Sequence, residues 1–234
     1  SNLSFSLKLG VNGIAITNII INVMLLIVSL LFLYKNDLPI FSNKEYNFRW
    51  FKGLIRKGGI SGLESLVRNL AFMLMIVRMV NVVGEQGTFW VANNFIWGWL
   101  LLPVLQLGEL IKADVGEEHY EAVKNRSIGY FSITTIIVIL WVITFPLWKP
   151  FMKHILQISN YNDVFFVVLI SVGFYVLFAF NNVIDSIFYG LGKTSYMLFQ
   201  SLVINIIFYG TAFVLFTTNV FTPNLTLIAL MFAS

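Results

Sequence analysis

Residues 58–116 read GGISGLESLVRNLAFMLMIVRMVNVVGEQGTFWVANNFIWGWLLLPVLQLGELIKADVG. Each of the two apolar runs in this segment, 59–83 and 89–113, exceeds the ~20 residues that carry a helix across the ~30 Å hydrocarbon layer of a membrane. An ionisable group inside a span costs about 2.5–3.5 kcal/mol by insertion scales, so such groups usually face a bundle interior or a wet cavity. Four polar side chains lie within or at the edge of these runs: Glu64, Arg68, Asn69 and Glu109. We therefore expect two membrane spans with function at their polar positions.

The composition of the whole chain excludes a soluble globular domain. Of the 234 residues, 58% are hydrophobic and 11% are charged, whereas soluble domains carry roughly 25% charged residues. The chain has no cysteine, and His119 and His154 fall in hydrophilic connections, so no metal site is expected. The HExxH, P-loop and GxSxG motifs are absent from the sequence, so we do not expect an enzyme. No nucleic-acid partner is expected either.

Further apolar runs predict spans at 11–34, 127–147, 164–189 and 196–216, and TPNLTLIALMFAS begins a seventh. The predicted fold class is therefore all-α, a polytopic transmembrane helix bundle with six full spans plus a partial one. The chain begins with Ser and stops within an apolar run, which indicates a piece of a longer transmembrane chain. No signal peptide is recognisable.

Three local patterns predict what lies within and between the spans. In NFRWFKGLIRK, basic residues at helical spacing alternate with aromatic and aliphatic ones, which is typical of a short helix at the headgroup level. The acidic segment DVGEEHYEAVKNR is expected to form a solvated loop. Pro103 is expected to free a backbone carbonyl and bend the third span.

Lysine and arginine residues are unevenly divided between alternate connections. Ten lie in the connections that follow the first, third and fifth spans, and four lie on the other side. The side that is richer in positive charge normally faces the cytoplasm. We therefore expect a multi-pass protein of the plasma (inner) membrane with residues 35–57 in the cytoplasm.

Three acidic side chains on three predicted spans lie at similar depth. At 1.5 Å per residue from the cytoplasmic ends, Glu64, Glu109 and Asp185 lie roughly 6–9 Å deep. Arg68 follows Glu64 by one helical turn, so the two can pair. They fit either a relay or gate in a wet cavity or a structural ion pair, and Glu109 also fits a side chain that reaches the interface.

The fifth span carries Asn182, Asp185 and Ser186 at offsets of three and four, so their side chains share one helix face. A face rich in oxygen atoms suits Na⁺ or a protonatable carboxylate. Together with Glu64, Arg68 and Asn69, these residues are the candidates for ion coupling or gating.

The third span combines aromatic and amide side chains on one face, at Trp90, Asn94 and Trp97. Such a wall can bind a flat, amphipathic cation by stacking and cation–π contact. Asn94 and Trp97 are therefore the candidates for a substrate cavity. Trp90 fits better as an interface anchor, because tryptophan is enriched at both membrane surfaces.

Several segments resemble the multidrug and toxic compound extrusion (MATE) transporter family. LGVNGIAITNIIIN is similar to its sixth helix and LIRKGGISGLESLVRNLAF to the start of its seventh. The proline-containing span that ends in DVGE is similar to the eighth helix, and FYGLGKTSYMLFQSLVINIIF to the turn between the tenth and eleventh. The order and spacing of these segments cover most of the chain.

The resemblance implies a fragment from the sixth helix to the start of the twelfth, which is most of one six-helix lobe of a two-lobe transporter. Residues 1–57 would be the last helix of the N-terminal lobe plus the cytoplasmic connection between lobes. Residues 58–234 would be the C-terminal lobe, incomplete at its last helix. The rest of the N-terminal lobe would be missing from this chain.

The family resemblance also implies a cation-coupled antiporter, in which Na⁺ or H⁺ enters as small organic, cationic or amphipathic compounds leave by alternating access. The two acids of the family's cation site are replaced by Asn69 and Phe180. Asp185 and Glu64 are possible substitutes, and a site in the N-terminal lobe is the alternative. A lipid-linked saccharide flippase, an intramembrane enzyme and a non-transporting membrane scaffold stay open. Membrane lipids are expected partners, and no cofactor beyond the coupling ion is expected.

Overall fold

The computed structural model describes residues 10–36, 48–218, 220 and 224–232. The chain divides into two compact units, Ser1–Phe48 and Arg49–Ser234. In the first unit, the described part is helix α1 (Gly10–Lys35). Within α1, Asn22 Nδ2 donates to the backbone carbonyl of Asn18 at 2.7 Å. Of the predicted connection at 35–57, residues 37–47 lie outside the described residues, and residues 49–57 belong to helix α2 (Arg49–Ala71).

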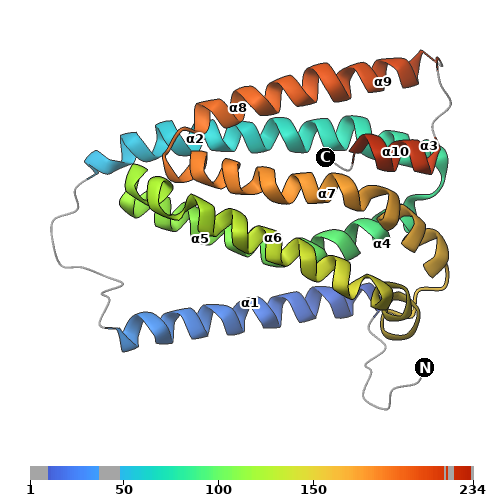
Figure 1. The fold of residues 1–234 in the computed structure, drawn as a ribbon, viewed down its shortest axis with the longest axis horizontal. Coiled ribbons are helices and arrows are strands. Elements are labelled where there is room, and N and C mark those ends of the chain that lie inside the picture. The colour runs from blue at the N-terminus through green and yellow to red at the C-terminus, as the bar shows by residue number, and fades with distance from the viewer. Residues whose placement is uncertain (1–9, 37–47, 219, 221–223, 233–234) are drawn as a thin grey trace. The chain divides into compact units, whose positions relative to one another are not determined.

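The second unit is an all-helical bundle (Figure 1). Its described helices, with short π-helical segments marked η, are α2 (Arg49–Ala71), η1 (Phe72–Ile76), α3 (Val77–Val83), α4 (Gln86–Phe95), η2 (Ile96–Leu100), α5 (Leu102–Glu118), α6 (Tyr120–Pro150), η3 (Phe151–Ile155), α7 (Tyr161–Gly190), α8 (Thr194–Val203), η4 (Ile204–Tyr209), α9 (Gly210–Thr217) and α10 (Leu225–Phe232). Among the described residues, five helices are long and apolar enough to cross a membrane, or six if one bent pair counts as a span. The predicted polytopic helical bundle is confirmed.

Helix α7 lies at the centre of the second unit. It packs against α4, α5, α6, α8 and α10 (Figure 1). Its buried side chains recur every three or four residues, which is the period of one helix face. That buried stripe comprises Val164, Val168, Ser171, Tyr175, Ala179, Val183 and Ser186. The residues of α7 that matter for function are therefore positioned by several helices at once.

The break predicted at Pro103 is confirmed. The helix pair Gln86–Leu100 and Leu102–Glu118 is bent by 51° at Leu101. Proline cannot donate a backbone hydrogen bond, so carbonyls near the bend need other partners. The indole Nε1 of Trp141 on α6 donates to the carbonyl of Leu100 at 3.1 Å, which stabilises the bend from a neighbouring helix.

Two predicted connections prove to be helical. The short surface helix expected before residue 58 is wrong as a separate element, because α2, η1 and α3 run unbroken over Arg49–Val83. Gly58 and Gly59 do not interrupt it, since each weakens a helix by only about 1 kcal/mol and packing against α8 holds it. The solvated loop expected after the third span is also wrong. Helix α5 ends at Glu118 and α6 begins at Tyr120.

Candidate functional site

Glu64 on α2 is the most deeply buried carboxylate among the described residues, at 5% exposure. Its Oε1 lies 3.3 Å from Arg68 Nη1, which forms the ion pair predicted from their spacing. Its Oε2 accepts a hydrogen bond from Tyr189 OH on α7 at 2.8 Å, and a longer one from Ser65 Oγ at 3.4 Å. Donors from two helices therefore compensate the burial of this carboxylate, as a buried charge requires.

Asp185 on α7 joins the same group of charges. It is partly buried and interacts electrostatically with Glu64, Arg68 and Lys112. Lys112 belongs to α5, and its Nζ lies 5.3 Å from the ring centroid of Tyr189. We call Glu64, Arg68, Lys112, Asp185 and Tyr189 the charged cluster. It brings together α2, α5 and α7, three helices that are far apart in the sequence.

The charged cluster carries two acids and two bases, and Glu109 adds a third acid at its rim. Lys112 Nζ lies 2.7 Å from Glu109 Oε1, and the Glu109 side chain is 66% exposed. Glu109 therefore lies on the exposed surface of the bundle, which agrees with its interpretation as a side chain that reaches the interface. Three acids against two bases leave one negative charge in excess, so the local field attracts a cation.

The oxygen-rich face predicted on α7 is divided by the structure. Asn182 Nδ2 donates to the carbonyl of Val104 on α5 at 3.1 Å. Ser186 Oγ is fully buried and has no hydrogen-bond partner among the described residues. Both side chains abut Gly108, where an added Cβ would lie 2.6 Å from Asn182 Nδ2 and 2.9 Å from Ser186 Oγ. Asn182 and Ser186 thus pack against α5, and of these three residues only Asp185 belongs to the charged cluster.

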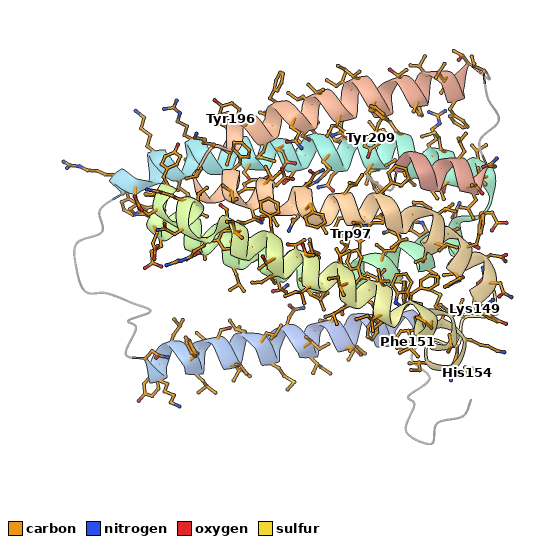
Figure 2. All side chains as sticks on the ribbon, in the orientation of Figure 1. Trp97, Lys149, Phe151, His154, Tyr196 and Tyr209 are labelled. Carbon is orange, nitrogen blue, oxygen red and sulfur yellow. The ribbon has the colours of Figure 1, made fainter. Side chains whose placement is uncertain are left out.

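The aromatic wall predicted on the third span is also divided. Trp97 lies in η2 and is 39% exposed, and its ring meets Phe178 and Tyr175 of α7 edge-on at 5.4 and 6.3 Å. Trp90 packs instead against Phe72 of η1 at 5.7 Å. The π-helical turn of η2 changes the residue spacing, so a face drawn for an α-helix does not continue through it. Figure 2 shows Trp97 about midway along the bundle.

Asn94 is exposed on α4 and Asn69 is exposed on α2. A small cavity lies between α4 and α7 and is lined by Asn93, Ser171 and Tyr175, among others. Its volume of about 10 Å³ suits a single water molecule. The described part of the chain contains no group of three His, Asp or Glu side chains placed to hold a metal ion.

A second ionic group ties α5 to α6. Arg126 binds Asp114, and its Nη2 lies 2.8 Å from Glu118 Oε1. Tyr130 OH also donates to Asp114. These contacts hold α5 and α6 together on either side of His119. The backbone φ of 55° at His119 lets the chain turn from one helix into the other. They explain why the acidic segment is helical rather than a loop.

Lys193 lies at the same end of the bundle, in the turn between α7 and α8. Its Nζ is 5.4 Å from the ring centroid of Tyr120, the first residue of α6. A hydrogen bond with Tyr120 raises the pKa of Lys193 above its usual value. The ammonium therefore stays charged at neutral pH and adds positive charge to this end.

Sequence reasoning missed Tyr189 and Lys112. One signal was present, because Tyr189 follows Asp185 by four residues and so lies on its helix face. Its partner Glu64 lies 125 residues away in the chain, which no local pattern reveals. Lys112 follows Glu109 by three residues, but its approach to Tyr189 depends on how α5 packs on α7.

Helix length and hydropathy define a multi-pass helical membrane protein. Between three of its helices, one buried carboxylate, Glu64, meets charges that are partly buried or exposed. Comparison of the chain with family models, with curated proteins and with solved structures gives no match.

Proposed function

We propose that this chain is part of a cation-coupled secondary transporter, in which the charged cluster binds or gates the coupling ion, Na⁺ or H⁺. The observation that carries the proposal is the burial of Glu64, at 5% exposure, inside a helix long and apolar enough to span a membrane. Ionisable groups in membrane spans usually mark ion pathways or proton relays. Asp185 places a second acid within electrostatic reach.

The excess of negative charge supports a cation as the coupling species. A cation that binds between Glu64 and Asp185 competes with Arg68 and Lys112 for the same carboxylates. The Arg68 side chain is 62% exposed, so it can turn away when its acid is neutralised. Since α2, α5 and α7 all contribute, ion binding changes contacts between helices, as alternating access requires.

The exported compounds are proposed to be amphipathic and organic, in keeping with the resemblance of several segments to MATE transporters. The partly exposed rings of Trp97 and Phe178, which pack on the buried Tyr175, support this choice, since such rings can contact flat cations. A flippase for lipid-linked saccharides would instead need a strongly cationic cavity. The charged cluster is not cationic, because its two bases are matched by two acids and Glu109 at its rim adds a third acid.

Asp185→Asn tests the proposed coupling. We expect the rate of cation-driven export to fall by about tenfold or more, which corresponds to ~1.4 kcal/mol of lost coupling. The measurement is transport of a fluorescent cation by the full chain in proteoliposomes, under imposed Na⁺ and pH gradients. Glu117→Gln, at an exposed acid outside the charged cluster, is the control that should transport normally. Equal rates for Asp185→Asn and the control would refute a coupling role for Asp185.

The proposed location is the plasma (inner) membrane, with residues 35–57 in the cytoplasm. Because the chain has no cysteine, single introduced cysteines can test this. Asn125→Cys and Ser159→Cys place exposed thiols at opposite ends of the bundle. In intact cells, an impermeant maleimide is expected to label Ser159→Cys and to spare Asn125→Cys. The reverse labelling pattern would show that the proposed orientation in the membrane is wrong. Ser42, a further natural choice, lies outside the described residues.

A further inference from the structure

Two lysines converge on one aromatic ring at the end of α6. The Nζ of Lys149 lies 5.8 Å from the ring centroid of Tyr161, and the Nζ of Lys153 lies 5.4 Å from the same centroid. Lys149 also lies 5.8 Å from the ring of Phe165, one helical turn further along α7. Figure 2 shows Lys149 with its neighbours Phe151 and His154 at one end of the bundle.

Neither lysine has a carboxylate partner. Both side chains are exposed, and among the side chains that the structure describes, neither forms an ion pair. The nearest acid in sequence on α7 is Asp163, two residues after Tyr161 and therefore about 200° around the helix. Asp163 thus lies on the face away from the lysines. Two ammonium groups that share one ring repel each other, and an anion between them would remove that repulsion.

The position of the lysines along α6 suits a lipid headgroup. Lys149 directly follows the apolar run that ends in ITFPLW, so it lies where the hydrocarbon layer gives way to the headgroups. Trp148 beside it is 5% exposed and packs against Phe95 at 5.9 Å, which fixes this turn on the bundle. Leu147 and Ile155 are 64% and 66% exposed on either side. The ammonium groups are therefore flanked by exposed apolar surface that acyl chains can cover.

We propose that Lys149 and Lys153 bind the phosphate of an anionic phospholipid, with the rings of Tyr161 and Phe165 against its glycerol and upper acyl region. A lipid phosphate is favoured over a free phosphate because the apolar side chains that flank the lysines face the membrane. In this site the two ammonium groups attract the phosphate, and cation–π contacts with the aromatic rings hold both lysines in place. The site is separate from the charged cluster and does not depend on the proposed function.

Native mass spectrometry of the full chain in detergent tests this site, with dioleoyl phosphatidylglycerol and dioleoyl phosphatidylcholine as the two probes. We expect phosphatidylglycerol to bind more tightly. Each lysine removed should weaken its binding by roughly fivefold, so Lys149→Gln with Lys153→Gln should lose roughly 25-fold. Binding of phosphatidylcholine by this double variant should stay at the unaltered level, which also shows that the variant is folded. Lys149→Arg with Lys153→Arg should keep the preference.

Arg78→Gln is the matched control, because Arg78 is an exposed cation on α3 at the same end of the bundle, with its guanidinium 5.9 Å from the ring of Phe213. Its phosphatidylglycerol binding should match that of the unaltered chain. Equal binding of the two lipids by the unaltered chain, or equal losses in Arg78→Gln and the lysine variants, would overturn the site. If inorganic phosphate at millimolar concentration displaced phosphatidylglycerol, the proposal of a lipid ligand would be refuted, and the two lysines would be assigned to a free anion.

Discussion

Glu64→Gln is expected to abolish cation-coupled transport while the protein stays folded. Glutamine keeps the side-chain volume and an oxygen that can accept the hydrogen bond of Tyr189 OH, now at 2.8 Å from Glu64 Oε2. It removes the negative charge that binds Arg68 at 3.3 Å and that attracts the coupling ion. We expect transport in proteoliposomes to fall by about 100-fold, equivalent to ~2.8 kcal/mol. The midpoint of thermal unfolding should change little.

Two further variants separate charge from structure at this position. Glu64→Leu leaves the partly buried Tyr189 OH without its acceptor, and the lost hydrogen bond costs about 1 kcal/mol of stability. Adding Tyr189→Phe should recover most of that stability without restoring transport. Glu121→Gln, an exposed acid near the start of α6, should transport normally. Should Glu64→Gln transport at the unaltered rate under both gradients, the charged cluster would be structural and the proposed mechanism would fail.

Gly190→Ala is expected to destabilise the bundle by loosening α5 from α7. A Cβ at Gly190 would lie 2.7 Å from Val115 Cβ and 3.0 Å from the carbonyl oxygen of Lys112, so the helices must separate. Overpacking of this kind costs about 1–3 kcal/mol. The measurement is the free energy of unfolding in detergent, or the shift of the thermal midpoint. Lys112 moves with α5, so a partial loss of transport should accompany the destabilisation.

Gly173→Ala is the matched control on the same helix. No atom lies within 4 Å of a Cβ placed at Gly173, and the residue is exposed within α7. Alanine favours a helix over glycine by about 1 kcal/mol, so this variant should be as stable as the unaltered chain or slightly more. If Gly190→Ala were equally stable, close approach of α5 and α7 at Gly190 would not be a source of stability.

Local chemistry predicted much of the fold and part of the site. The lengths of the apolar runs predicted the spans, and Pro103 predicted the bend at Leu101. The spacing of Glu64 and Arg68 predicted their ion pair. Each of these depends on residues within about one turn, or on the run length that a bilayer demands. The sequence alone is therefore enough to predict the spans, the bend and this ion pair.

Contacts between distant helices determined the rest. The acidic segment after the third span looked solvated, but Arg126 binds Asp114 and Glu118 and holds it as helix. The π-helical turn η2 directs Trp97 to α7, away from Trp90. Local residue spacing predicts neither the helical acidic segment nor the direction of Trp97. The same charges can occur in a loop or in a helix, and the same sequence can form an α-helical or a π-helical turn.

The sequence by itself determined that this is a membrane-spanning helical chain with charged residues inside its spans, because hydrocarbon excludes unpaired polar groups whatever the topology. Only the tertiary structure decided which groups meet. Packing of α7 against α5 and proximity to α2 turn Asp185 toward the acid–base pair and Asn182 and Ser186 toward Gly108. The physical reason is that one helix face is shared by several neighbours, and the packing of those neighbours selects the partner of each side chain.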